Sequence, residues 1–576
     1  MLFPQSNRCR SLQSLDGFWR FAKDEQNNGE QQGWPNGIPY DREVGVPASW
    51  NEQDQDLMQF FETGWYEREF ESLDSWRNSR VWLRIGAANY YTKVWVNNAY
   101  IGDHEGGHLP FEFDITEQLV HDRPNKVVIS VYVRIKPDSL PPGEVEHEHI
   151  IQLNGERGQF PRNYYDFFPY GGINRSVSLY TTSSTRIEDI TINTAYLQNT
   201  GTIHYSIRLN EPFTGQLSAV IGDQHQLIQL NDQTEATGEL MIEQVRLWSM
   251  DDPHLYELQV NLSQDDRFID RYTLPVGVRT IEVTKTQLLL NGEPIFLKGV
   301  GMHEDFPVLG KGAHTAIITK DMNLIKWLGG NSFRTSHYPY NEEFLNYADR
   351  NGILVISETP FVGFVESHYN KEILAKAQRV ISELIHRDKN HPSVIAWSLA
   401  NEGNTFVPDA DWFYKGLYDH AKSLDSSRPI TIVNCLDVEG DVALQHFDFV
   451  SLNRYYGWYE LPGLLEEAGE VLDAQLEKCY AKFGKPVMIT EFGADAVAGM
   501  HTDPAELFSE EYQADMITQQ YAIIRSKPYT IGAHVWVLFD FKTSQSSKRV
   551  ILNRKGLFTR ERQPKLAAHR VREQWR

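Results

Sequence analysis

The sequence has few cysteines and no long hydrophobic run. Its 576 residues include only three cysteines, Cys9, Cys435 and Cys479, and this odd number at wide spacing argues against a secreted disulfide framework. No apolar run approaches the roughly 18 residues that a membrane-spanning helix needs. The first residues, 1–8, lack the apolar stretch of a signal peptide. These absences predict a cytoplasmic protein that does not enter a membrane.

Positive charge is also scarce. The chain has 55 Lys and Arg against 78 Asp and Glu, a formal net charge of −23. Such an acidic surface repels phosphate backbones and anionic lipids, so we expect neither nucleic acid nor membranes as partners. An anionic small substrate would bind only where local cations oppose the overall field.

Motifs for metals and phosphate-bearing cofactors are missing. The sequence has no Gly-rich phosphate loop, no His-Glu-x-x-His and no cysteine pair spaced for zinc. The run Glu146-His147-Glu148-His149 contains metal-ligand residue types, but no further ligand accompanies it at a suitable spacing, which favours a solvated loop. We therefore expect no metal and no cofactor.

The pattern of the chain changes once, near residue 276. At roughly 100–200 residues per domain, three or four domains are expected. Before the change, short β-branched and aromatic runs with Gly and Asn turns predict two successive β-sandwiches, 1–182 and 183–276. After it, apolar runs alternate with helical patterns, which predicts a (β/α)8 barrel over 277–576. Its eight candidate strands are 296–300, 332–335, 353–356, 394–398, 430–433, 449–452, 487–490 and 533–536.

Two glutamates stand where such a barrel carries its chemistry, at the C-terminal ends of strands. The fourth run ends in Asn401-Glu402 and the seventh in Glu491. Cleavage of a glycosidic bond needs two carboxylic acids, one protonated to release the leaving oxygen and one ionised. A chain with 78 acids places some at strand ends by chance, but this placement favours an active site.

Longer segments around these glutamates resemble a known family. The stretch 388–402 is similar to the acid/base signature of glycoside hydrolase family 2, and Thr490-Glu491-Phe492-Gly493 resembles its nucleophile strand. The resemblance covers essentially the whole chain. It implies a jelly-roll sugar-binding-like β-sandwich, an immunoglobulin-like β-sandwich and a catalytic (β/α)8 TIM barrel, in that order. Within the family the β-glucuronidase branch is most similar, on segments 166–168, 334–340, 453–459 and 553–556.

The resemblance implies a role for each matching residue. Glu402 would be the general acid/base, Glu491 the nucleophile, and Asn401 would hydrogen-bond the sugar 2-hydroxyl. Five residues would surround the sugar: Asp166, His337, Tyr455, Tyr459 and Trp536. Three would gather at its carboxylate: Arg549, Asn553 and Lys555. Fixed local cations suit an anion in so acidic a protein. Taken singly, each of these residues favours a structural role, such as barrel core for Trp536.

The implied activity is that of a retaining exo-β-glucuronidase, which removes terminal β-D-glucuronic acid from a small-molecule or oligosaccharide glucuronide. A homodimer or homotetramer is expected by analogy. The alternatives are a β-galacturonidase, a β-galactosidase on the same scaffold, or a non-hydrolytic carbohydrate-binding protein. A retaining reaction predicts about 5–5.5 Å between the carboxyl groups of Glu402 and Glu491, with Glu402 protonated near neutral pH.

Overall fold

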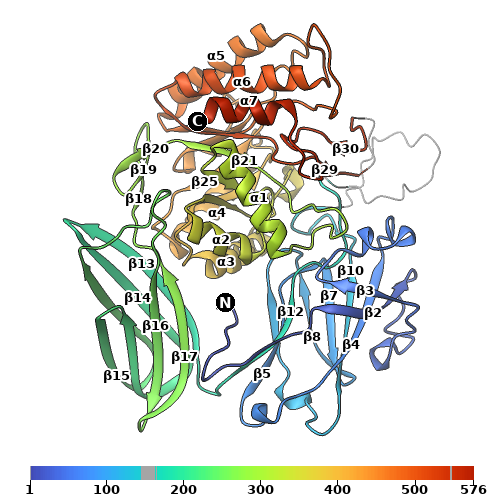
Figure 1. Ribbon diagram of the computed structural model, residues 1–576, viewed down its shortest axis with the longest axis vertical. Coiled ribbons are helices and arrows are strands. Elements are labelled where there is room, and N and C mark those ends of the chain that lie inside the picture. The colour runs from blue at the N-terminus through green and yellow to red at the C-terminus, as the bar shows by residue number, and fades with distance from the viewer. Residues whose placement is uncertain (1, 144–162, 164, 545–547) are drawn as a thin grey trace.

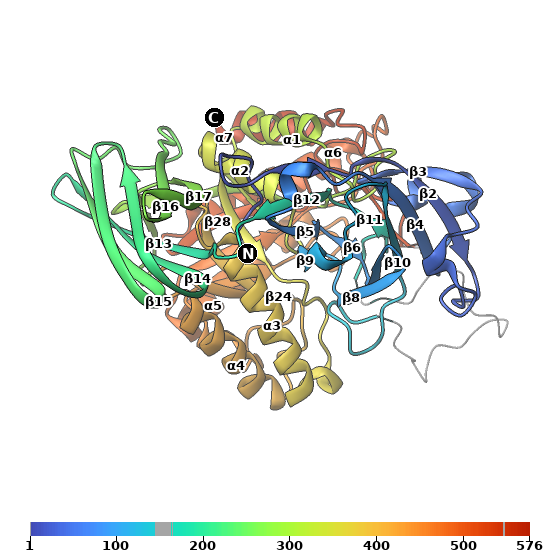
Figure 2. The ribbon, with the colours of Figure 1, turned by 90° about the horizontal axis from the view of Figure 1, so that it is seen from below.

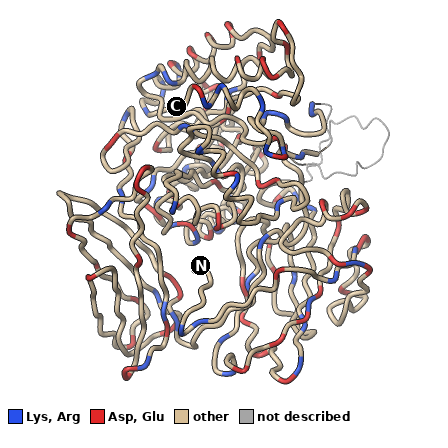
Figure 3. Tube along the Cα trace, in the orientation of Figure 1, with Lys and Arg blue, Asp and Glu red and all other residues tan. Residues whose placement is uncertain are grey.

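The computed structural model of the chain describes residues 2–143, 163, 165–544 and 548–576. The run 146–149, interpreted above as a solvated loop, lies outside the described residues. Two β-rich domains lie side by side beneath an α/β barrel (Figure 1). Seen from below, they flank opposite sides of the barrel (Figure 2). Lys and Arg are mixed with Asp and Glu along all three parts of the described chain (Figure 3), so the negative charge is spread over the molecule.

Two antiparallel sheets pack face to face in the first domain, as the strand pattern predicted. Along β10, the side chains of Val127, Ile129 and Val131 point into one buried cluster with Trp19 and Tyr66, because alternate residues of a strand share a face. The larger sheet has the order β3 (Arg42–Val46), β2 (Gly17–Asp24), β4 (Thr63–Phe70), β10 (Asn125–Tyr132), β7 (Tyr91–Val96), β8 (Ala99–Glu105). The smaller has the order β1 (Leu12–Ser14), β12 (Val177–Thr182), β5 (Arg80–Ile85), β9 (Phe111–Asp114).

The second domain is built on two long strands, β14 (Thr200–Ile221) and β15 (Gln224–Glu243). Their pairing shifts register after Arg208. Before the shift β14 pairs with β13 (Ile187–Leu197), and after it with β16 (Tyr256–Gln264), which pairs with β17 (Arg267–Val276). Side chains from both halves, including Ile203 and Leu217, pack in one buried cluster. The two halves of the long strands therefore enclose a single hydrophobic core.

The third part is a closed barrel of eight parallel strands, each at a position predicted from the sequence. The strands are β21 (Leu297–Gly301), β22 (Ser332–Arg334), β23 (Leu354–Glu358), β24 (Val394–Asn401), β25 (Ile430–Asn434), β26 (Val450–Asn453), β27 (Val487–Glu491) and β28 (Thr530–Val535). The helices are α1 (Thr315–Leu328), α2 (Glu342–Asn351), α3 (Lys371–Asp388), α4 (Asp409–Leu424), α5 (Leu465–Phe483), α6 (Glu510–Ser526) and α7 (Leu566–Trp575). Within the described ranges, no helix is both long and apolar enough to cross a membrane.

Buried ion pairs fix the first domain to the barrel. Arg84 of β5 pairs with Glu342 at the start of α2, with 2.7 Å between nitrogen and oxygen. Arg175 pairs with Glu304 at 3.1 Å and donates to a backbone carbonyl of the loop after β22. The backbone N–H of Phe168 donates to the carbonyl of Lys542 at 3.0 Å. The segment 165–168 of the first domain is thereby held at the mouth of the barrel.

Candidate active site

A cavity of about 290 Å³ opens at the C-terminal ends of the barrel strands. Ten of the eleven predicted site residues line it: Asp166, His337, Asn401, Glu402, Tyr455, Tyr459, Glu491, Trp536, Arg549 and Asn553. The sequence reasoning did not single out the other eight: Tyr165, Phe167, His303, Val362, Cys435, Asn453, Arg454 and Glu460. Lys555 is not among the lining residues. The first domain thus contributes its segment 165–167 to a cavity whose other lining residues come from the barrel.

Glu402 follows directly after β24 and carries the first of the two carboxyl groups. Its φ of 55° lies in the left-handed region, a conformation that non-glycine residues adopt rarely and that concentrates at functional sites. Its backbone N–H donates to the carbonyl of Val433 at 2.9 Å, which holds this conformation. Burial, and then the negative charge of Glu491, raise the pKa of the Glu402 carboxyl. An environment of this kind favours a protonated acid.

Glu491 ends β27, and both of its oxygens are held by donors. The guanidinium of Arg334 donates to Oε1, and the hydroxyl of Tyr455 donates to Oε2 at 2.6 Å. Nε2 of His337 lies 3.6 Å from Oε1. The imidazole of His337 in turn stacks on Trp536, with 5.0 Å between ring centroids. These contacts fix the direction in which the carboxylate faces the cavity.

A buried pair that the sequence reasoning missed lies behind Glu491. Nη1 of Arg334 lies 2.7 Å from each oxygen of Glu358, and Nδ1 of His337 lies 2.9 Å from Oε1 of Glu358. Although burial alone would raise it, the positive charge of Arg334 holds the pKa of Glu358 below its usual value. Arg334 ends the second strand and Glu358 the third. The strand-end rule that selected the two glutamates would have selected this pair too.

Asn453, at the end of β26, connects the acid to its neighbour Asn401. Its Nδ2 donates to Oε1 of Glu402 at 2.7 Å and lies 3.3 Å from Oδ1 of Asn401. The hydroxyl of Thr490 donates to Oδ1 of Asn453 at 2.9 Å, which fixes the amide's orientation. Because this donor favours the ionised form of Glu402, it limits the rise of that carboxyl's pKa.

A second polar group forms the side of the cavity nearest the first domain. Arg549 pairs with Asp166 at 2.6 Å, and Nδ2 of Asn553 donates to the same carboxylate at 2.8 Å. Nη2 of Arg549 also donates to the hydroxyl of Tyr459 at 2.9 Å. Nη1 of Arg549 is buried and has no hydrogen-bond partner among the described residues. The structure thus brings Arg549 and Asn553 together around a carboxylate from the first domain.

Lys555, predicted as a cation facing the sugar, is buried beside the cavity. Its side chain is 1% exposed, and Nζ lies 2.5 Å from Oδ1 of the fully buried Asp495 and 3.0 Å from the hydroxyl of Tyr459. The rings of Trp458 and Tyr459 lie 5.0 and 4.7 Å from this nitrogen. Asp495 thus balances the charge of Lys555, which is not among the residues that line the cavity.

The part of the chain that the structure describes contains no group of three or more His, Cys, Asp or Glu side chains that could hold a metal ion.

Comparisons with known proteins cover the whole chain. Three descriptions of glycosyl hydrolases family 2 match in order: the sugar binding domain over residues 12–183, a domain with the family's name alone over 175–279, and the TIM barrel domain over 281–576. A β-glucuronidase of Paenibacillus borealis is 42% identical over 595 residues, which are 100% of this chain and 98% of the relative. That of Canis lupus familiaris is 40% identical over 604 residues, 100% of this chain and 92% of the relative.

Solved structures of β-glucuronidases share the fold of this chain over its whole length. The β-glucuronidase of an uncultured Clostridium sp. superposes with a TM-score of 0.92 at 38% identity, covering 100% of this chain and 99% of that one. The β-glucuronidase from Ruminococcus gnavus in complex with D-glucaro-δ-lactam gives 0.93 at 34% identity, with coverage of 100% and 99%.

Proposed function

The chain belongs to the glycoside hydrolases of family 2, and on that premise we propose that it is a retaining exo-β-glucuronidase. The observation that carries the proposal is the pair of carboxyl groups at the ends of β24 and β27. Glu402 has a raised pKa, whereas both oxygens of Glu491 accept hydrogen bonds from Arg334 and Tyr455. Two carboxyls in such different surroundings divide naturally into an acid and a nucleophile.

The proposed reaction has two displacements. In the first, Glu491 attacks the anomeric carbon while Glu402 gives its proton to the glycosidic oxygen, so the C–O bond breaks and the sugar becomes an ester of Glu491. In the second, the Glu402 carboxylate takes a proton from water. The water oxygen attacks the same carbon, and Glu491 leaves. The two inversions return the β-configuration, which requires about 5–5.5 Å between the carboxyl groups.

Substrate recognition is proposed for the residues around the pair. Asn401 uses its amide oxygen on Asn453, which leaves its amide N–H groups for the sugar 2-hydroxyl. Asp166, His337, Tyr455, Tyr459 and Trp536 contact the remaining faces of the sugar. Arg549 and Asn553 bind the C6 carboxylate, supported by the unused buried donor at Nη1 of Arg549. Lys555, which is paired with Asp495, supports this group by holding the hydroxyl of Tyr459. Charge-assisted bonds such as those of Arg549 give the strongest recognition of a carboxylate.

A panel of 4-nitrophenyl glycosides tests this specificity. We expect the β-D-glucuronide to be hydrolysed with a much higher kcat/KM than the β-D-glucoside, the β-D-galactoside and the β-D-galacturonide. A preference for the galacturonide or the galactoside would assign the site to that sugar. Absence of hydrolysis throughout, in protein that still binds glucuronate, would identify a carbohydrate-binding protein.

We also propose a cytoplasmic location and a homodimer or homotetramer. All three cysteines are free, as is usual for proteins of reducing compartments. Family analogy supports the oligomer, and light scattering on the purified chain measures its mass directly.

A further inference from the structure

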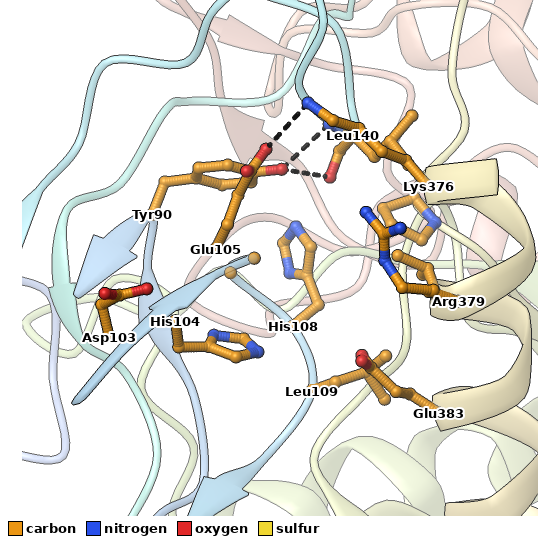
Figure 4. A pocket seen from close by; sticks show the side chains of 14 residues that line it. Tyr90, Asp103, His104, Glu105, His108, Leu109, Leu140, Lys376, Arg379 and Glu383 are labelled. Atoms are coloured by element: carbon orange, nitrogen blue, oxygen red, sulfur yellow. Dashed lines mark hydrogen bonds and ion pairs between the residues drawn. The ribbon is translucent and has the colours of Figure 1, made fainter. Parts of the chain in front are cut away.

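A second cavity, of about 250 Å³, lies between the first β domain and helix α3 of the barrel. In Figure 4 the rings of Tyr90, His104 and His108 stand on the side of the first domain, and the side chains of Lys376, Arg379 and Glu383 face them from α3. This cavity and the active-site cavity share no lining residue. Nothing in the proposed reaction uses it.

Two neutral imidazoles with unused hydrogen-bonding capacity form part of its wall. Nδ1 of His104 and Nδ1 of His108 are buried and have no hydrogen-bond partner within the described ranges. Burial lowers the pKa of His104 to about 4 and that of His108 well below its usual value, so both rings are uncharged at neutral pH. His104 stacks on Phe111 and His108 on Tyr338, with centroids 4.1 and 4.5 Å apart. Their positions are therefore fixed in the absence of a ligand.

The opposite wall, from α3, carries two charged groups that form no ion pair with any described residue. Lys376 is occupied, because it pairs with Asp138 at 2.6 Å and lies 3.7 Å from Glu105. Arg379 and Glu383 make no ion pair or hydrogen bond with the residues that the structure describes, although both line the cavity. A ligand here meets a guanidinium and a carboxyl on the same helix face, since positions i and i+4 are neighbours. Burial raises the pKa of the Glu383 carboxyl, and the positive charge of Arg379 opposes that rise.

We propose that this cavity binds a single ring of a neutral sugar. A hydroxyl group both donates and accepts, so one polyhydroxylated ring can pair with the guanidinium of Arg379 and the carboxyl of Glu383 at once, beside the fixed rings of His104 and His108. The apolar side chains of Leu109, Leu140 and Val380 in the same lining suit the C–H face of the ring. The volume is below the roughly 300–1,000 Å³ of pockets for drug-sized ligands, which fits one ring rather than an oligosaccharide.

The charges of the lining favour a neutral sugar over an acidic one. Three carboxylic acids line the cavity, Asp103, Glu105 and Glu383, against two cations, Lys376 and Arg379. With both histidines neutral the lining carries no excess of positive charge, and the chain as a whole is at −23. An anion would therefore meet only the guanidinium of Arg379, within the negative electrostatic potential of the whole protein.

Ligand-observed NMR with methyl β-D-glucopyranoside tests the proposal, with methyl β-D-glucuronide as the acidic probe. We expect saturable binding of the neutral glycoside that weakens at least tenfold in Arg379→Ala and in Glu383→Ala. Lys371→Ala, an exposed position on the same helix, should retain it. Asn401→Ala should retain it too, because Asn401 lies in the active-site cavity and is assigned to the 2-hydroxyl that this glycoside also carries. Arg379 and Glu383 are exposed, so both variants should fold, and circular dichroism and an unchanged urea midpoint verify this.

The result separates this site from the proposed catalytic one. Absence of binding overturns the proposal, as does binding that survives Arg379→Ala. Binding that is lost in Asn401→Ala would place the sugar in the active-site cavity and overturns it as well. Arg379-dependent binding of methyl β-D-glucuronide alone would refute the neutral-sugar assignment. None of these outcomes depends on whether the chain hydrolyses glucuronides.

Discussion

The hydrogen bond from Asn453 to Glu402 sets how far the pKa of the proposed acid rises. Burial and the charge of Glu491 raise this pKa, and the amide donor, 2.7 Å from Oε1, opposes them. Asn453→Leu removes the donor at nearly constant volume. A hydrogen bond to a charged group contributes about 1.5–3 kcal/mol, and one pKa unit corresponds to about 1.4 kcal/mol. The loss therefore predicts a rise of about 1–2 units, nearer 1 where cavity water replaces the donor.

The assay is the pH dependence of kcat/KM for phenyl β-D-glucuronide, whose leaving group needs the proton. Because the acid acts in its protonated form, a higher pKa moves the alkaline limb to higher pH. Cys435→Ala is the matched control, since Cys435 lines the same cavity and burial raises the pKa of its thiol, which stays neutral. An alkaline limb that stays in place, or moves to lower pH, in Asn453→Leu would refute the assignment of Glu402 as the acid.

Three further predictions follow from the same contacts. Glu491→Gln should lower turnover more than about 10³-fold and lower the pKa of Glu402 in a ¹³C NMR titration, since a negative neighbour is lost; turnover within tenfold of wild type would exclude Glu491 as nucleophile. Asn553→Ala should lower kcat/KM for the glucuronide about 10–100-fold by loss of one charge-assisted bond and leave the glucoside unchanged; equal losses would contradict carboxylate recognition. Lys555→Met leaves the buried Asp495 with only its longer contact to Nη1 of Arg549, at 3.9 Å, so it should destabilise the protein by up to about 3–5 kcal/mol, measured as a lower urea midpoint. Adding Asp495→Asn should restore most of the loss; a double variant no more stable than Lys555→Met would contradict the ion pair as the cause.

The barrel and its two glutamates were predictable because the sequence records them locally. A strand buried on both faces appears as a continuous apolar run, and the residue after the run stands at the barrel mouth. The same rule covers Arg334, Glu358 and Asn453, which were overlooked. The start of helix α1 at Thr315 carries no such local signal, because its N-cap is His314, which is not among the usual capping residues.

The partners of the cations were not predictable in this way. Lys555 and Asp495 are 60 positions apart, and Arg549 and Asp166 are 383 apart in different domains. No periodicity or spacing records such pairs, because the packing of the domains brings them together. The sequence showed that cations were present but not that carboxylates of the chain itself would hold them. The domain boundaries at 182/183 and 276/277 stay predictions.

One measurement tests the central claim most directly, ¹H NMR of the first-formed product during hydrolysis of 4-nitrophenyl β-D-glucuronide. The account predicts that β-D-glucuronic acid appears first and the α-anomer only later by mutarotation, because Glu491 and then water attack the same carbon. Initial release of the α-anomer would contradict the double displacement, and absence of hydrolysis would contradict the assignment of the site to glucuronides.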